Sequence, residues 1–269
     1  MISLAIIAFG YGLYSLVLPN RAQQLPKPSD EEWPGVSFVI PAYNEEQFLA
    51  KKIENTLRSI YPKEKLEIII AADGSTDNSQ KVCADFPVRF ENNGERAGKS
   101  AAMNRAAAYA KHEILIFSDA NALLNPEAIR EIVRPLLLPQ YAMSSGEKKV
   151  IKKEEGENAS EGEGLYWKYE SFLKQKDSNF YTLLGAVGEL FGMKKSHFVE
   201  IPKNFLVDDF YEAACILQQG YQIRYVPEAV ATEYGSLNFK EEIKRKIRIS
   251  AGGYQSIFHF KSLFNPLKN

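Results

Sequence analysis

The chain has 269 residues, a formal net charge of −1, 45% hydrophobic residues and 25% charged residues. This is the composition of an ordinary globular protein with room for one large α/β domain, and it excludes a largely disordered chain or a disulfide-stapled miniprotein. The balanced charge gives no indication of a nucleic-acid partner, and two isolated cysteines, Cys83 and Cys215, favour a reduced setting without a structural zinc site.

The N-terminal segment is apolar and carries no charged side chain before Arg21. A run of this length crosses the hydrocarbon core of a bilayer as a helix, so residues 1–19 are predicted to be a transmembrane helix, with a cleaved signal peptide as the alternative. Arg21 and Lys27 follow the run, which predicts a protein of the inner (plasma) membrane with its remainder in the cytoplasm. Residues 20–34 contain three prolines and are predicted to be a linker.

Short apolar runs then alternate with segments of helical spacing. Strands are expected at residues 36–40, 66–72, 88–90 and 113–118, and helices at 45–59, 79–83, 99–111 and 126–138. This alternation predicts an α/β fold with a mostly parallel central sheet flanked by helices. Polar residues follow three of the predicted strands, at the sheet edge where such folds bind their ligands.

The second half of the chain is less regular. Residues 144–164 are charged and rich in glycine, so they are predicted to be a mobile surface excursion. Helices are expected at 165–174 and 208–218, a glycine-punctuated strand and turn at 185–193, and a strand at 223–226. Residues 240–269 hold seven Lys or Arg and two Glu among aromatic and aliphatic residues, which predicts a basic amphipathic segment on an anionic membrane surface or packed on the domain.

The polar residues at the predicted strand ends are of the types that bind a metal and a diphosphate. Carboxylates hold hard cations, and Lys99 with the pair Arg245 and Arg248 can neutralise phosphate charge. Asp209, at the start of a predicted helix, could take a proton from a hydroxyl, although each carboxylate alone could equally be a helix cap. Gly94 precedes Gly98 by four residues instead of five, which argues against a Walker loop ending in Lys99.

Six ordered segments of residues 35–255 resemble the family-2 glycosyltransferases, which are inverting enzymes of the GT-A fold. The segments are VSFVIPAYNEE at 36–46, ADGSTDNS at 72–79, GKSAAMN at 98–104, SDAN at 118–121, DD at 208–209 and RKIRI at 245–249. The resemblance implies an α/β GT-A catalytic domain over residues 35–239, followed by a lid or membrane-interface segment over 240–269.

The resemblance also implies roles for single residues. The nucleotide pocket would be lined by Pro41, Ala42, Tyr43 and Glu45, with Asp73 on the base or ribose and Lys99 near the phosphates. Asp119 would face the ribose and, with Asn121, a divalent metal, Mg²⁺ or Mn²⁺. Arg245 and Arg248 would approach the diphosphate, and Asp209 would be the catalytic base.

The function that follows is transfer of a sugar from a nucleotide-diphosphate sugar, with a UDP-sugar favoured. The acceptor would be a carbohydrate or lipid-linked hydroxyl in cell-surface polysaccharide or glycolipid synthesis. Asn121 stands where the family has a second Asp, Ile249 stands where membrane synthases have Trp, and the chain ends early, which suggests a truncated form. A catalytically degenerate sugar-nucleotide sensor or assembly subunit is the alternative. A sugar-nucleotide pyrophosphorylase is disfavoured because residues 41–46 read PAYNEE.

Overall fold

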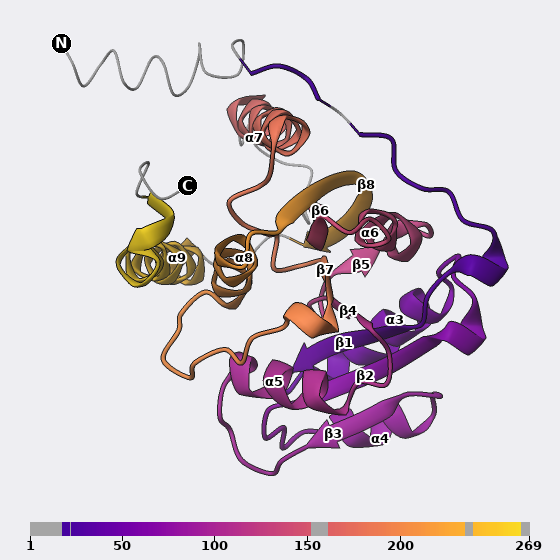
Figure 1. Ribbon diagram of the computed structural model, residues 1–269. Coiled ribbons are helices and arrows are strands. Elements are labelled where there is room, and N and C mark those ends of the chain that lie inside the picture. The colour runs from indigo at the N-terminus through magenta and orange to yellow at the C-terminus, as the bar shows by residue number, and fades with distance from the viewer. Residues whose placement is uncertain (1–17, 22, 152–160, 235–238, 265–269) are drawn as a thin grey trace.

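The computed structural model describes residues 18–21, 23–151, 161–234 and 239–264. These residues form an eight-stranded sheet in the order β3-β2-β1-β4-β7-β6-β8-β5, with helices packed against both faces (Figure 1). The fold is therefore the expected α/β arrangement.

The N-terminal half is a parallel sheet with crossover helices. Its strands are β1 (Val36–Ala42), β2 (Leu66–Ala72), β3 (Arg89–Asn92) and β4 (Ile114–Phe117), and its helices are α3 (Glu46–Leu57), α4 (Ser79–Ala84) and α5 (Lys99–Tyr109). β1 pairs in parallel with β2 and with β4, so the carboxyl ends of these three strands meet at one edge. The strand and helix positions predicted from the sequence for this half agree with the structure to within a few residues.

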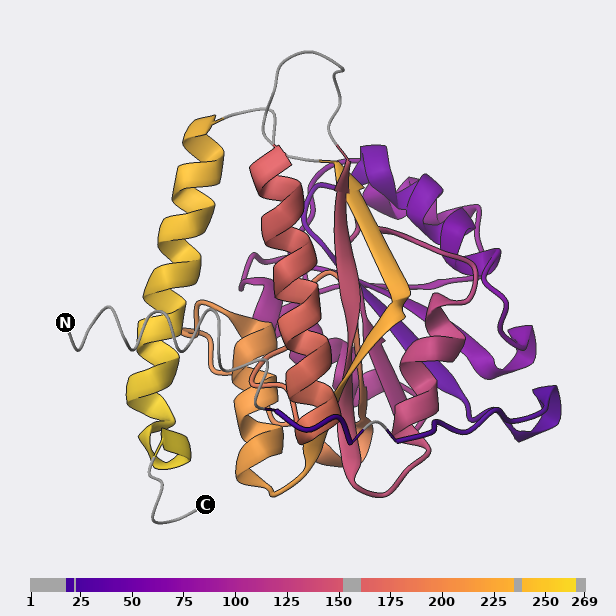
Figure 2. The ribbon, with the colours of Figure 1, turned by 90° about the horizontal axis from the view of Figure 1, so that it is seen from above.

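The C-terminal half completes the sheet with both orientations. It contains β5 (Leu123–Leu124), α6 (Ala128–Leu136), β6 (Tyr141–Ile151), α7 (Glu161–Phe180), β7 (Phe191–Lys194), α8 (Asp208–Gln218), β8 (Gln222–Tyr234) and α9 (Phe239–His259). β7 runs antiparallel to both β4 and β6, whereas β6 and β8 are parallel to each other. In Figure 2, α9 lies along the outside of the molecule, and it packs against α8 and the segment that precedes α8.

The sheet separates two apolar cores. Every residue of β1 is buried, and alternate side chains go to opposite faces. Phe38 and Ile40 pack on one face with residues of α3 and α6, while Val39 packs on the other with residues of α5 and α8. A strand buried on both sides needs a continuous apolar run, which is why β1 could be recognised from the sequence.

The predicted mobile excursion over residues 144–164 was wrong for much of its length. Residues 144–151 belong to β6, an interior strand, and α7 already begins at Glu161. Ser144 and Ser145 are buried, and Lys148 forms ion pairs with Glu189 and Glu233. Glu147 and Lys148 thus contact side chains of neighbouring segments, which a charge run read along the sequence could not show. Residues 152–160 of the predicted excursion lie outside the described residues.

The transmembrane helix predicted as part of the fold needs correction. Among the residues that the structure describes, no helix has the length and apolar character needed to cross a bilayer. Most of the predicted span, residues 1–17, lies outside the described residues. The location at the plasma membrane stays a prediction. The predicted linker runs along the domain, where Trp33 is buried and Arg134 Nε donates a hydrogen bond to the backbone oxygen of Pro26 at 2.7 Å.

Candidate active site

Two loops that follow β1 and β2 are fastened to each other at the carboxyl edge of the sheet. The backbone N–H of Thr76 donates to Asn44 Oδ1 at 2.8 Å, and the N–H of Asn44 donates to Ser75 Oγ at 3.1 Å. The N–H of Glu46 donates to Asp77 Oδ2 at 3.0 Å. Asn44 has a φ of 55°, a left-handed conformation that asparagine tolerates better than most residues. These contacts give the nucleotide-binding segments predicted from the sequence a fixed relative position.

Asp73 holds the loop that leads into α5. Its two carboxylate oxygens accept hydrogen bonds from the backbone N–H groups of Ala97 and Gly98, at 2.7 and 2.8 Å. Gly98 has a φ of 97°, a value that favours glycine, and it directly precedes the first residue of α5. Asp73 therefore holds the two residues that directly precede Lys99 and α5. Its predicted contact with the base or ribose stays a prediction.

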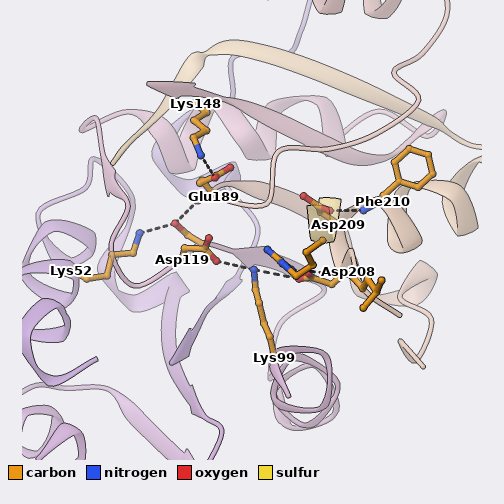
Figure 3. Close-up of polar contacts among 11 residues, drawn as sticks. Lys52, Lys99, Asp119, Lys148, Glu189, Asp208, Asp209 and Phe210 are labelled. Atoms are coloured by element: carbon orange, nitrogen blue, oxygen red, sulfur yellow. Dashed lines mark hydrogen bonds and ion pairs between the residues drawn. The ribbon is translucent and has the colours of Figure 1, made fainter. Parts of the chain in front are cut away.

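Lys99 joins the two halves of the site (Figure 3). Its Nζ lies 2.8 Å from Asp119 Oδ1, beyond the end of β4, and 3.3 Å from Asp208 Oδ2, at the start of α8. Burial alone would lower the pKa of Lys99, but the two carboxylates outweigh burial and raise the pKa. The lysine therefore stays charged and connects residues that are far apart in the sequence.

Asp209 occupies the first turn of α8 beside this ion-pair cluster. Its Oδ1 accepts a hydrogen bond from the N–H of Phe210 at 2.7 Å. Burial and the adjacent Asp208 carboxylate raise the pKa of Asp209 to about 7, against the lowering effect of Lys99. A carboxylate with a pKa near neutrality is suited to accept and release a proton.

The nucleotide-pocket residues predicted from the sequence lie on and after β1. Pro41 and Ala42 are buried at the end of that strand, while the ring of Tyr43 is exposed. The guanidinium of Arg96 stacks over the Tyr43 ring at 4.0 Å from its centroid. Burial, and then the charges of Asp119 and Asp77, raise the pKa of Glu45, so Glu45 is electrostatically coupled to the Lys99 cluster.

The predicted metal ligands offer oxygen atoms only. Asp119 shares one oxygen with Lys99, and Asn121 is exposed two residues later. In the described part of the chain, no group of three or more His, Cys, Asp or Glu side chains is arranged to hold a metal ion. The donor set suits Mg²⁺ or Mn²⁺ only if a diphosphate and water complete the coordination. The residues thus fit a metal that is bound together with a nucleotide.

The structure does not bring the two predicted arginines into this cluster. Arg248 Nη1 donates to the backbone oxygen of Leu206 at 3.1 Å. Arg245 acts electrostatically on Glu233, whose pKa it helps to lower against the larger raising effect of burial. Both lie on α9, and their predicted contact with a diphosphate stays a prediction.

Sequence reasoning missed Lys52, which lies beneath the Asp119 loop. Its Nζ donates to Ser118 Oγ at 2.6 Å and to the backbone oxygen of Ala122 at 2.5 Å, so it bridges both ends of that loop. Complete burial lowers the pKa of Lys52 to about 7. The signal was available, because Lys52 is three residues after Leu49 and four before Thr56, on the buried face of α3.

Glu189 and Lys148 were also missed. Figure 3 shows Glu189 between Lys148 and Asp119. Its backbone oxygen accepts a hydrogen bond from Ser118 Oγ at 2.8 Å. Lys148 lies in a run of charges, and nothing in the sequence pairs it with Glu189.

Comparisons with known proteins bear on the family and the fold of this chain. A family model described as "Glycosyl transferase family 2" matches residues 37–201. The probable glycosyltransferase YdaM of Bacillus subtilis (strain 168) is 23% identical over 265 residues, which cover 88% of this chain and 60% of that protein. The poly-beta-1,6-N-acetyl-D-glucosamine synthase of Staphylococcus aureus (strain COL) is 24% identical over 275 residues, 98% of this chain and 65% of that protein. This chain thus spans less than two thirds of these relatives.

Solved structures show the same fold. The mannosyltransferase PcManGT from Pyrobaculum calidifontis, in complex with GDP-Man and Mn²⁺, has a TM-score of 0.76 at 23% identity, covering 98% of this chain and 75% of the other. GalNAc-T7, with UDP, GalNAc and Mn²⁺, has a TM-score of 0.59 at 18% identity, covering 88% and 52%. At such identities the likeness confirms the GT-A fold alone.

Proposed function

The chain belongs to glycosyl transferase family 2, and from that premise we propose that it transfers a sugar from a nucleotide-diphosphate sugar to an acceptor hydroxyl. The observation that carries this proposal is the Lys99 ion-pair cluster. In this cluster Lys99 pairs both with Asp119, at the predicted nucleotide edge, and with Asp208, the residue before Asp209. A donor-binding group and a general base must lie this close for direct transfer.

Asp209 is the proposed base. With its pKa raised to about 7, roughly half of the Asp209 side chains are ionised near neutral pH, and the ionised form is basic enough to take the acceptor proton. The deprotonated oxygen then attacks the anomeric carbon while the bond to the nucleoside diphosphate breaks. A single displacement of this kind inverts the anomeric centre.

The departing diphosphate gains negative charge, which Lys99 is placed to offset. We propose that Asp119 and Asn121 hold a divalent metal together with the diphosphate, and this metal would supply Lewis-acid stabilisation of the leaving group. Mn²⁺ in the two solved neighbours supports the choice of a divalent metal.

The substrates are proposed by class. GDP-Man and UDP in the neighbouring complexes support a nucleotide donor, and a UDP-sugar is our first candidate. The polysaccharide synthase among the relatives supports a carbohydrate or lipid-linked acceptor in the synthesis of a cell-surface polysaccharide or glycolipid.

The test is release of nucleoside diphosphate from a panel of UDP-, GDP- and dTDP-sugars, with Mn²⁺ or EDTA and a membrane extract as acceptor. We compare wild type with Asp209→Asn, which keeps the shape of the side chain and removes its basicity. Release from one donor, dependent on Mn²⁺, should fall by a factor of about 100 or more in the variant. Asp85→Asn, at an exposed aspartate after α4, is the matched control and should release nucleotide at the wild-type rate.

Three results would contradict parts of the proposal. Undiminished release by Asp209→Asn would exclude Asp209 as the base. Undiminished release in EDTA would exclude the metal. Nucleotide binding without release from any donor would favour the sugar-nucleotide sensor or assembly subunit.

We also propose that α9 contacts an anionic lipid surface. Five large apolar side chains on one face of this helix are exposed, namely Ile243, Ile247, Tyr254, Ile257 and Phe258. Monomeric soluble proteins rarely expose so contiguous a patch. Lys244 and Lys246 lie near the edges of this face, and their positive charge complements an anionic headgroup layer.

A further inference from the structure

Glu189 is fixed between the two carboxylates that the proposed reaction uses. On one side, its backbone oxygen accepts the hydrogen bond from Ser118, the residue before Asp119. On the other side, a Cβ atom added to Gly188 would lie 2.8 Å from Asp209 Oδ2. The backbone at residues 188–189 therefore runs from the donor side of the site to the base.

The turn that carries Glu189 is held by its own contacts. The N–H of Leu190 donates to the oxygen of Val187 at 3.1 Å, and the N–H of Val187 donates to Ser145 Oγ at 2.9 Å. Ser145 is a buried residue of β6. Because the turn is attached to the sheet, the Glu189 side chain has a defined origin.

Lys148 then fixes the direction of that side chain. Its Nζ pairs with Glu189 Oε1 and also with Glu233 Oε1 (Figure 3 shows the pair with Glu189). The three side chains are only 8–16% exposed. One lysine faces two glutamates, and the positive charge of Arg245 also acts on Glu233. Burying such a cluster brings little stability, which points to a use in the site.

The negative charge of Glu189 acts on Asp209, the proposed catalytic base. It adds to the burial and the Asp208 charge that raise the pKa of Asp209. A carboxylate that only shifted the pKa of Asp209 would bring the reaction no benefit. A contact with the substrate would explain its position, because a sugar acceptor carries further hydroxyls next to the one that reacts.

On the premise of the proposed function, we propose that Glu189 accepts a hydrogen bond from an acceptor hydroxyl that neighbours the reacting one. Glu189 is thus a specificity-determining residue for the acceptor, and Lys148 is its positioning residue. An ionised carboxylate only accepts hydrogen bonds, and its bonds to hydroxyls are among the stronger ones. Lys148 engages Oε1, and we assign Oε2 to the acceptor.

The experiment follows the fate of a labelled donor sugar. The protein receives the radiolabelled UDP-sugar that wild type turns over, Mn²⁺ and membrane extract, and the label is divided between free sugar, from hydrolysis, and extract, from transfer. The affinity for UDP is measured separately by calorimetry. Glu189→Gln should keep UDP affinity within about twofold, while the ratio of transfer to hydrolysis falls by a factor of about 10 or more.

Two further variants separate positioning from mere packing. Lys148→Met should lower the same ratio, and Lys148→Arg should restore much of it, because arginine can still pair with Glu189. Glu228→Gln, at an exposed glutamate of β8, is the matched control and should leave the ratio within about twofold of wild type.

Each outcome has a distinct meaning. If transfer and hydrolysis fall together in Glu189→Gln, Glu189 serves the base and the acceptor role is excluded. If UDP affinity in Mn²⁺ collapses, Glu189 belongs to the metal and donor site. An unchanged ratio excludes any acceptor contact. A wild type that neither binds UDP nor turns over any donor contradicts the proposed function itself.

Discussion

Gly188 lies so close to Asp209 that the absence of a side chain there has a consequence for the base. An added Cβ would meet Asp209 Oδ2 at 2.8 Å, and this is the movable end of a side chain rather than backbone. We expect Gly188→Ala to push the carboxylate aside at small cost to the fold. The rate of transfer should fall by a factor of about 10 to 100, since catalysis is sensitive to displacements of about 1 Å. Steady-state kinetics and thermal unfolding measure the two effects.

The control for this substitution lies in the same loop. A Cβ on Gly185 would approach Phe210 only at 3.5 Å, an ordinary van der Waals contact. Gly185→Ala should therefore retain the wild-type rate. Equal losses in both variants would mean that the loop tolerates no added side chain, and that the position of Asp209 does not explain the effect.

At the scale of the element, α8 holds a buried ionisable side chain, Glu212, that should make the stability of the fold depend on pH. Glu212 follows Asp208 by one turn and is completely buried. Burial, with a contribution from the Asp208 charge, raises the pKa of Glu212 from 4.5 to about 8. The folded state thus favours the protonated form. The associated stability is complete below about pH 4.5 and is lost as the pH rises through 8.

Glu212→Gln should remove this pH dependence, because glutamine resembles the neutral acid. Urea unfolding at pH 5, 7 and 9 should show the variant gaining on wild type with increasing pH, by on the order of 2–4 kcal/mol at pH 9. Glu228→Gln, at an exposed glutamate of β8, should follow wild type at every pH. A constant difference between Glu212→Gln and wild type would show that Glu212 does not ionise over this range.

The elements that could be predicted from sequence are those whose own residues, or the residues directly beside them, show the pattern of a buried strand or of a helix start. β1 and β2 are continuous apolar runs, and α5 starts directly after a glycine. β6 could not be predicted because its charges are satisfied by residues far away in sequence. Lys148 pairs with Glu189 and Glu233 only after β6, β7 and β8 have assembled.

The candidate site shows the same limit. Asp73, Lys99, Asp119 and Asp209 stand in recognisable segments, and the structure brings Lys99, Asp119 and the start of α8 together. Lys52 and Glu189 stand outside those segments and act through contacts across the fold. A motif identifies residues that share a local pattern, whereas their supporting contacts depend on the order of strands in the sheet.

At the scale of the whole molecule, the lipid contact proposed for the exposed face of α9 can be tested by substitution. Replacing Ile247, Tyr254 and Phe258 together by serine removes apolar area from this face, and these residues do not contribute to the two buried cores. Sedimentation with vesicles rich in anionic lipid should capture wild type. The affinity of the triple variant for the vesicles should be lower by a factor of about 10 or more. Raised salt should weaken wild-type binding, because Lys244 and Lys246 supply part of the attraction.

The matched control is Ile60→Ser, at an exposed apolar residue after α3, which should bind vesicles as wild type does. Equal binding by wild type and the triple variant would place the lipid contact elsewhere. Failure of wild type to bind vesicles, with dimers seen by light scattering that the triple substitution abolishes, would make a second copy of the chain the occupant of this face. The response to lipid charge and to salt distinguishes a headgroup layer from a protein surface.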